Sequence, residues 1–119
     1  MTKPFALIVE DDPSLNEIIV LTLQEDFDLE TCTDGTATMQ ILGNIIPQIV
    51  VLDLNIPGTP GREILAYIRS DKRFQRTRVI VATADNRQAE ILRNEADIIL
   101  LKPVSPMQLR ELALRISSL

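Results

Sequence analysis

The chain alternates between short apolar runs and longer segments whose apolar residues recur with the period of a helix. Four of the runs are continuous in Ile, Val and Leu, which is typical of parallel strands covered on both faces. The run at 29–33 instead alternates apolar and polar residues, which predicts a strand at or near the edge of a sheet. The pattern as a whole predicts five strands, at residues 5–9, 29–33, 49–52, 79–83 and 98–101.

The segments between the runs carry apolar faces at helical spacing. Three faces are expected to pack on the sheet: Leu15, Ile18, Ile19 and Thr22; Ile64, Leu65 and Ile68; and Leu109, Leu112, Ala113 and Ile116. A capping residue followed by proline predicts helix starts at Asp12-Pro13, Thr59-Pro60 and Ser105-Pro106. Two further caps are Asp34, before a helix at 35–44, and Asp85, which with Gln88 resembles a capping box before a short helix at about 86–93.

Strand and helix alternate five times along the chain, which predicts right-handed βαβ units. Such units build a parallel sheet with helices on both faces. The sequence has no internal linker, repeat or low-complexity segment. We therefore expect residues 1–119 to form one domain, a doubly wound α/β sandwich.

Composition narrows the classes of function. With no histidine and only one cysteine, Cys32, the chain has neither a histidine–cysteine zinc site nor a Ser-His-Asp or Cys-His catalytic set. A net charge of −5 and 3% aromatic residues argue against direct nucleic-acid binding. The single cysteine, the lack of a long apolar stretch and a start without a signal-peptide layout predict a cytoplasmic location away from membranes. Cys32 itself is expected in the core.

Polar side chains follow the apolar runs where the strands end. In an open parallel sheet, ligands bind beyond the carboxyl ends of the strands. The residues at these positions are Glu10, Asp11 and Asp12 after the first run, Asp53 and Asn55 after the third, Thr83 at the end of the fourth, and Lys102 after the fifth. Acids, a hydroxyl and an ammonium are thus expected to meet at one end of the sheet.

The acids at this end predict a metal site. Carboxylates this close repel one another, and a hard divalent cation such as Mg2+ relieves the repulsion. Glu10, Asp11 and Asp53, with the backbone carbonyl of Asn55, are the expected ligands. Asp12, which precedes Pro13, is expected to cap a helix instead.

The same end of the sheet is suited to phosphoryl transfer. A metal-bound carboxylate at Asp53 can attack phosphorus, and Lys102 with the cation can neutralise charge on the oxygens. The Thr83 hydroxyl can donate to a phosphoryl oxygen. The residues alone therefore predict a site at which an aspartate is phosphorylated.

Four segments resemble the receiver domain of two-component response regulators, the CheY-like superfamily: LIVEDD, VVLDLNIPGTPG, VIVATAD and IILLKPV. The resemblance covers essentially the whole chain. It implies a flavodoxin-like (βα)5 sandwich with strand order 2-1-3-4-5. It assigns Asp53 as the phosphoacceptor that becomes 4-aspartylphosphate, Thr83 as the switch hydroxyl, and Lys102 as the contact to a phosphoryl oxygen, before a proline whose peptide bond is usually cis.

The resemblance also implies cofactors and partners. It implies Mg2+, with Mn2+ as an alternative, at Glu10, Asp11, Asp53 and the Asn55 carbonyl. The phosphodonor would be a sensor histidine kinase or a histidine phosphotransfer protein. The phosphorylated domain would signal by binding through the face made by the fourth helix, the fifth strand and the last helix. The bound partner would be an unknown protein, an output domain or a second copy in a homodimer. The chain would catalyse its own phosphorylation and dephosphorylation without being a conventional turnover enzyme.

The sequence departs from the family pattern at two positions. The family usually carries Tyr, Phe or His three residues before the lysine, and that ring moves on activation; here the second switch position is Ile99. Glu95 stands where a glycine is common. Asp85, two residues past Thr83, lies where the family tunes phosphate lifetime, and a role as a helix cap is equally expected.

Three other functions would leave recognisable signals in the sequence. Ile99 favours a receiver-like docking module that works without phosphorylation, whereas the complete set of acids, threonine and lysine argues against it. A haloacid dehalogenase-type phosphatase would carry a second acid two residues after the nucleophile, where this chain has Asn55. A flavin- or nucleotide-binding domain would carry a glycine-rich loop after the first strand, and no such loop is present.

Overall fold

The computed structural model, which describes residues 2–118, is a parallel sheet between two layers of helices. The elements follow the order β1 (Phe5–Val9), α1 (Pro13–Leu23), β2 (Asp28–Cys32), α2 (Gly35–Leu42), β3 (Ile49–Asp53), α3 (Gly61–Ser70), a 3-10 turn (Lys72–Phe74), β4 (Arg78–Thr83), α4 (Asn86–Leu92), β5 (Ile98–Leu101) and α5 (Pro106–Ser117). The strand order is β2-β1-β3-β4-β5 and every pairing is parallel. The expected flavodoxin-like fold is confirmed; residues 1 and 119 of the expected domain lie outside the described part.

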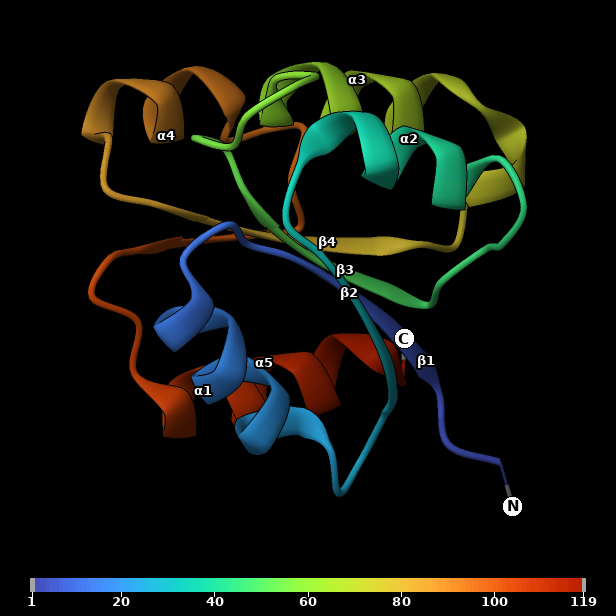
Figure 1. Ribbon diagram of the computed structural model, residues 1–119, viewed down its shortest axis with the longest axis vertical. Helices are drawn as coiled ribbons and strands as arrows, with labels where there is room; N and C mark the ends of the chain where they lie inside the picture. The colour runs from blue at the N-terminus through green and yellow to red at the C-terminus, as the bar shows by residue number, and fades with distance from the viewer. Residues whose placement is uncertain (1, 119) are drawn as a thin grey trace.

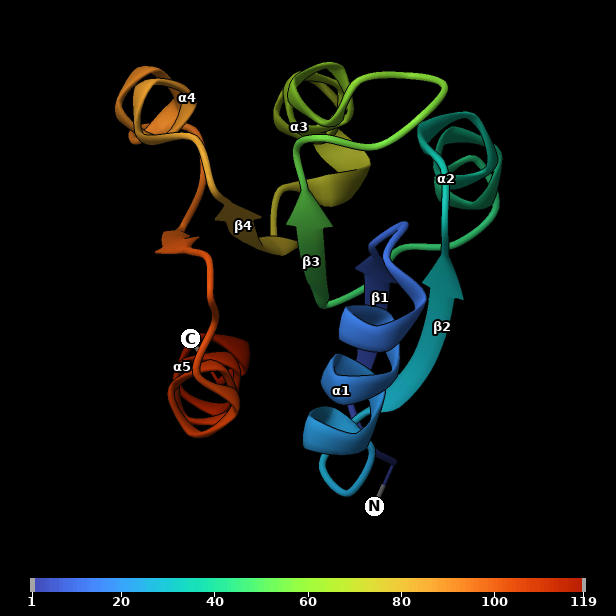
Figure 2. The same cartoon turned by 60° about the vertical axis from the view of Figure 1, so that its left-hand side comes forward.

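The helices cover the two faces of the sheet unequally. α1 and α5 lie on one face and α2, α3 and α4 on the other (Figure 1). In Figure 2 the arrows of β1, β2 and β3 point the same way, so their carboxyl ends meet at one edge of the molecule. Along β1 and β3, successive side chains enter opposite layers: Leu7 and Val50 pack toward α2 and α3, and Ile8 and Val51 toward α1 and α5. Burial on both faces explains why these strands are continuously apolar.

The two edge strands differ from the central ones. β2 lies at the edge of the sheet, as its alternating sequence predicted, although it begins one residue earlier than expected. It buries only Cys32. The apolar run of β5 also forms an edge strand, and its side chains enter both layers as expected: Ile98 and Leu100 pack toward α1 and α5, and Ile99 toward α2, α3 and α4. Leu101, at its end, is 51% exposed. None of the helices within residues 2–118 has the length and apolar character needed to cross a membrane.

Most helix starts follow the predicted caps. Asp12, Asp34, Asp85 and Ser105 each accept a hydrogen bond from a backbone N–H in the first turn of the helix that follows. The prediction at Thr59-Pro60 is wrong, because α3 begins one residue later and lacks a side-chain cap.

Two further differences concern α1 and α4. On α1, Ile18 is 45% exposed, and the buried residues are Ile19 and Leu23. Before α4, the Gln88 side chain donates to the Asp85 carboxylate, so the pair does not form the reciprocal capping box.

Candidate functional site

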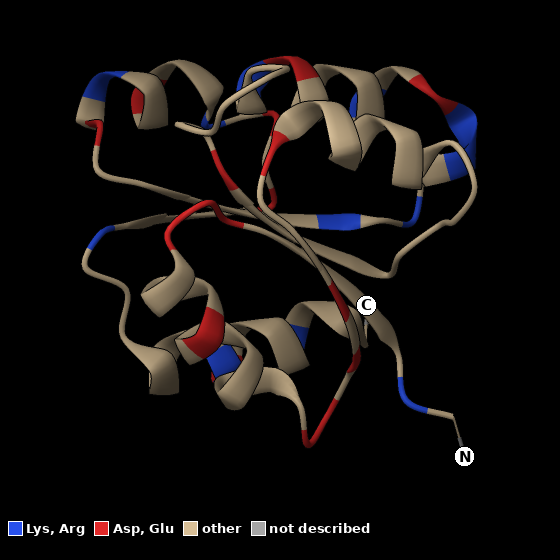
Figure 3. Ribbon diagram, in the orientation of Figure 1, with Lys and Arg blue, Asp and Glu red and all other residues tan. Residues whose placement is uncertain are grey.

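Three carboxylates meet at the carboxyl ends of the neighbouring strands β1 and β3. One oxygen from each of Glu10, Asp11 and Asp53 lies within 4.8 Å of the others. Glu10 is 2% and Asp53 4% exposed, whereas Asp11 is open to solvent. Figure 3 shows acidic positions on the segments that follow β1 and β3, near one another at this end of the sheet. The neighbouring register of the two strands, with Val9 beside Leu52, brings these acids together.

Lys102 is the cation of this cluster. Its Nζ lies 3.0 Å from Glu10 Oε1 and 3.2 Å from Asp53 Oδ2. Its backbone N–H donates to the Thr83 carbonyl at 2.9 Å, which anchors the residue at the end of β5. Burial by itself lowers the pKa of Lys102, but the hydrogen bonds to Glu10 and Asp53 outweigh it and the pKa is raised. The ammonium therefore stays charged between the two acids. The Lys102–Pro103 peptide bond is cis, as expected.

Glu10 is the acid most affected by burial. Burial raises its pKa from 4.5 to about 7, the hydrogen bond from Lys102 opposes the rise, and the neighbouring Asp53 adds to it. Its Oε2 also accepts a hydrogen bond from the Asp12 backbone N–H at 3.2 Å. Near neutral pH, a single lysine thus does not hold this carboxyl fully ionised. A cation at the cluster would favour the ionised form.

Asp53 is oriented by the chain that follows it. Its Oδ1 accepts a hydrogen bond from the Asn55 backbone N–H at 3.1 Å, an Asx-type turn at the end of β3. The other oxygen faces Lys102. Asn55 is exposed beside the cluster. Its carbonyl as a metal ligand stays a prediction.

The two expected switch positions lie on β4 and β5, and Thr83 directly follows Ala82, the residue paired with Asp53. Thr83 is fully buried at the end of β4, and its hydroxyl accepts a hydrogen bond from the Asp85 backbone N–H at 3.0 Å. Ile99 is half-buried and packs against the core under α2, α3 and α4. It also lines a cavity of about 280 Å³ between α4 and β5, together with Ala89, Glu90, Arg93, Ala96, Asp97 and Leu101. Asp85 is a helix cap in this structure, bonded to the N–H groups of Arg87 and Gln88.

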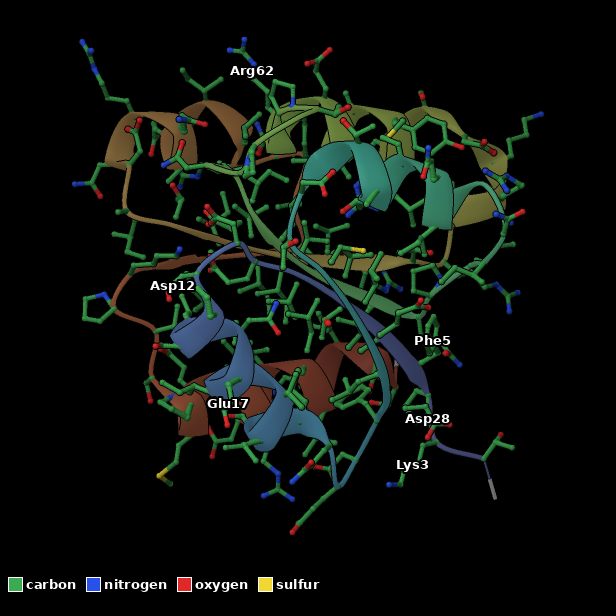
Figure 4. All side chains as sticks on the ribbon, viewed as in Figure 1. Lys3, Phe5, Asp12, Glu17, Asp28 and Arg62 are labelled. Carbon is green, nitrogen blue, oxygen red and sulfur yellow. The ribbon has the colours of Figure 1, made fainter. Side chains whose placement is uncertain are left out.

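An apolar groove lies beside the lysine. Its cavity measures about 430 Å³ and runs between the start of α1 and the loop from β5 to α5. Its walls are Asp12, Ser14, Leu15, Ile18, Lys102, Pro103, Val104 and Pro106. Asp12 stands at the start of α1, at the rim of this groove (Figure 4). The exposed side of Ile18 is part of this surface.

Sequence reasoning missed two contacts that shape the site. The Asn16 side chain, on α1, donates through Nδ2 to the Glu10 carbonyl at 2.9 Å. The loop after β3 presses against the start of α2: Gly35 donates to the Pro57 carbonyl at 2.8 Å, and a Cβ at Gly35 would lie 1.7 Å from the Thr59 carbonyl oxygen. Asn16 had no distinguishing signal, because α1 also carries Ser14, Glu17 and Thr22; for the second contact, a glycine just after a helix cap was the available signal.

An acidic cluster with a lysine at the carboxyl ends of a five-stranded parallel sheet is the arrangement that the sequence predicted for a receiver domain. The model of the "Response regulator receiver domain" family matches residues 6–114. The chain belongs to this family, which works in two-component signalling, and its acidic cluster is typical of the family's phosphorylation site.

Known relatives show the settings in which similar domains occur. The chain is 31% identical over 107 residues to "DNA-binding response regulator MtrA" of Mycolicibacterium smegmatis, covering 87% of this chain and 46% of that protein. It is 30% identical over 110 residues to "Hybrid signal transduction histidine kinase D" of Dictyostelium discoideum, covering 90% of this chain and 7% of that protein. The chain thus spans less than half the length of these curated relatives.

A solved receiver domain shows the likeness in fold. The receiver domain of the sensor histidine kinase PA1611 from Pseudomonas aeruginosa superimposes with a TM-score of 0.88 at 20% identity, covering 99% of this chain and all of that one. That structure is described with a magnesium ion coordinated in the active site cleft.

Proposed function

We propose that residues 1–119 act as a single receiver domain that accepts a phosphoryl group on Asp53 in a Mg2+-dependent reaction. The observation that carries the proposal is the pairing of a nearly buried Asp53 with Lys102 inside a cluster of three acids. A purely structural cluster gains nothing from like charges at this distance, because their repulsion destabilises the fold. A site that binds a cation and a phosphoryl group needs them.

The donor set fits Mg2+. Three carboxylate oxygens within 4.8 Å of one another, one of them on exposed Asp11, suit a hard cation that keeps several waters. We assign Glu10, Asp11, Asp53 and the Asn55 carbonyl as its ligands; Mn2+, which accepts the same oxygen donors, is the alternative. The magnesium described in the PA1611 receiver domain supports this assignment. When bound, the cation neutralises charge on the acids and on the transferring phosphoryl oxygens.

The residues of the chain have separate roles in the transfer. A carboxylate oxygen of Asp53 forms the new bond to phosphorus, while the bond from phosphorus to the donor's imidazole nitrogen breaks and its electron pair leaves with that nitrogen. Lys102, already 3.2 Å from Asp53, pairs with a phosphoryl oxygen. Thr83 turns its hydroxyl from Asp85 to donate to another phosphoryl oxygen. Attack of water on phosphorus then releases phosphate and restores the Asp53 carboxylate, so the domain catalyses both its phosphorylation and its dephosphorylation.

The family and two surfaces of the domain, the groove beside Lys102 and the α4-β5-α5 face, indicate the kinds of partner protein. The donor is a histidine kinase or a histidine phosphotransfer protein, and the apolar groove beside Lys102 is suited to hold it close to Asp53. The receiving partner contacts the α4-β5-α5 face, as an output domain, a separate protein or a second copy. We propose a cytoplasmic location and no direct nucleic-acid contact by this domain.

A docking module that works without phosphorylation is the second candidate function. The observation that favours it is Ile99, together with the open cavity that this side chain lines between α4 and β5. An aliphatic residue there leaves a partner site whose shape does not depend on a ring changing position.

Intact-protein mass spectrometry after incubation with acetyl phosphate, with and without Mg2+, separates these functions. The receiver predicts one phosphoryl group per chain that requires Mg2+ and is absent in Asp53→Asn. Asp28→Asn is the matched control, because Asp28 is exposed at the opposite end of the sheet and should leave the adduct unchanged (Figure 4). A folded protein that takes no phosphoryl group, or one that Asp53→Asn still modifies, refutes the proposal; the first result favours the docking module.

A further inference from the structure

The side-chain amide of Asn16 ties the first helix to the acidic turn. Asn16 lies in the first turn of α1, half-buried, and its Nδ2 donates to the Glu10 backbone carbonyl at 2.9 Å. Its own backbone N–H donates to the Asp12 carbonyl at 2.9 Å. One residue thus bonds to both ends of the turn from Glu10 to Asp12. The turn also carries Asp11, the exposed acid of the cluster.

The Asn16 amide is one of several hydrogen-bond partners that hold the backbone N–H, the backbone carbonyl and the carboxylate of Glu10. The Glu10 N–H donates to the Cys32 carbonyl at 3.1 Å, which continues the pairing of β1 with β2. The carboxylate is held by Lys102 and by the Asp12 N–H. The carbonyl is held by Asn16. Without that donor the carbonyl would lose its partner at the point where the chain leaves the sheet.

The chemistry of this position favours a neutral amide. An aspartate of the same shape would have no N–H to donate and would add a fourth negative charge close to three others. An alanine would leave the carbonyl unbonded while favouring the helix, because alanine has the highest helix propensity. A loss of function in Asn16→Ala would therefore arise in the turn and not from a weakened α1.

We propose that Asn16 is a positioning residue for the cation site: by holding the Glu10 carbonyl it keeps the Glu10 and Asp11 carboxylates in register with Asp53. It touches no reacting atom. This inference rests on the proposed Mg2+-dependent function and adds to it a residue outside the ligand set. Partners that orient metal ligands typically change metal affinity about 10- to 100-fold when they are removed. Because Asn16 acts on the backbone and leaves both carboxylates present, we expect the lower end of that range.

The test measures Mg2+ binding and phosphorylation in wild type, Asn16→Ala and Asn16→Leu. Isothermal titration calorimetry gives the Mg2+ dissociation constant without any phosphodonor. We expect the dissociation constant to rise about tenfold in both variants, because each removes the amide donor without adding a charge that would itself attract the cation. With acetyl phosphate, the Mg2+ concentration for half-maximal rate should rise by the same factor, whereas the rate at saturating Mg2+ should stay within about twofold, because Asp53 and Lys102 are untouched.

Asn44→Ala is the matched control. The Asn44 side chain donates to the Gln40 carbonyl at 3.2 Å at the end of α2, which is the same kind of bond away from the acids. It should leave Mg2+ affinity unchanged. A merely structural role for Asn16 would lower the unfolding temperature without shifting the half-saturating Mg2+ concentration, and that result would overturn the inference.

The binding data also separate this inference from the proposed function. If wild type and both Asn16 variants bind Mg2+ equally tightly, the proposed role of Asn16 is refuted and the proposed metal site is unaffected. Wild-type protein that binds no Mg2+ refutes the proposed metal site, and the inference falls with it. Asn16→Leu, which keeps a similar side-chain volume without a donor or a charge, decides the matter should Asn16→Ala fail to fold.

Discussion

The raised pKa of Glu10 makes the stability of the metal-free protein depend on pH. The pKa is about 7 in the folded chain against an ordinary value of 4.5, mainly because the side chain is buried. The folded state therefore binds a proton more tightly than the unfolded state, and stability falls as pH rises between these two values. One pKa unit corresponds to about 1.4 kcal/mol, so the full difference is about 3 kcal/mol. Below pH 4.5 this contribution is fully present, and above pH 7 it is lost.

The assay is urea unfolding followed by circular dichroism in EDTA at pH 5, 6, 7 and 8. In wild type we expect the free energy of unfolding to fall by most of that 3 kcal/mol across the series. Glu10→Gln, which cannot ionise, should flatten the profile. The control is Glu17→Gln, because Glu17 is exposed on α1 (Figure 4) and its removal should leave the wild-type slope. Saturating Mg2+ at pH 8 should raise stability in wild type, since a bound cation stabilises the folded state. Parallel pH profiles for wild type and Glu10→Gln would refute the reasoning.

Two further substitutions test contacts that stabilise the fold. Gly35→Ala should lower the free energy of unfolding by more than about 2 kcal/mol, because the added Cβ would lie 1.7 Å from the Thr59 carbonyl oxygen. The control is Gly43→Ala, where the nearest atom is 3.3 Å away and the free energy of unfolding should change by less than about 1 kcal/mol. Urea unfolding measures both, and equal effects would contradict the close contact. Asp97→Ala should cost about 2–3 kcal/mol in the same assay, since its carboxylate accepts bonds from the Val79 N–H at 2.7 Å and from an arginine at 2.6 Å. Asp26→Ala removes the ion pair with the half-exposed Arg110 and should cost under about 1 kcal/mol, and a loss as large as that of Asp97→Ala would count against the argument.

The fold could be predicted because its signals are local. Continuous apolar runs gave four of the strands within one residue, and Asp12, Asp34, Asp85 and Ser105 gave four of the helix starts. The order of strands came from the family resemblance. Errors arose where a tertiary contact decided the outcome. Thr59 does not cap α3, because the chain there packs against the start of α2.

The site could be predicted only in part. The expectation that Glu10, Asp11 and Asp53 meet followed from strand ends in a parallel sheet and is confirmed. The burial of Glu10 and its raised pKa could not be anticipated, because they depend on how the sheet and Lys102 enclose the side chain. Asn16 was missed for a related reason: its role depends on the angle at which α1 leaves the turn, and no local pattern encodes that angle.

Hydrogen bonds connect Thr83 to the start of α4, and this connection does not require an aromatic ring at position 99. The Thr83 hydroxyl accepts the Asp85 N–H, and the Asp85 carboxylate in turn caps α4. α4 has seven residues, of which only Leu92 is buried, so little else holds its first turn. If Thr83 turns toward a phosphoryl group as proposed, the Asp85 N–H loses a bond worth about 1 kcal/mol. That is a large perturbation for so short a helix, because its stability depends on its cap and its few buried contacts. We therefore expect the start of α4 to move on phosphorylation, with Ile99, which lines the cavity between α4 and β5, accommodating the change.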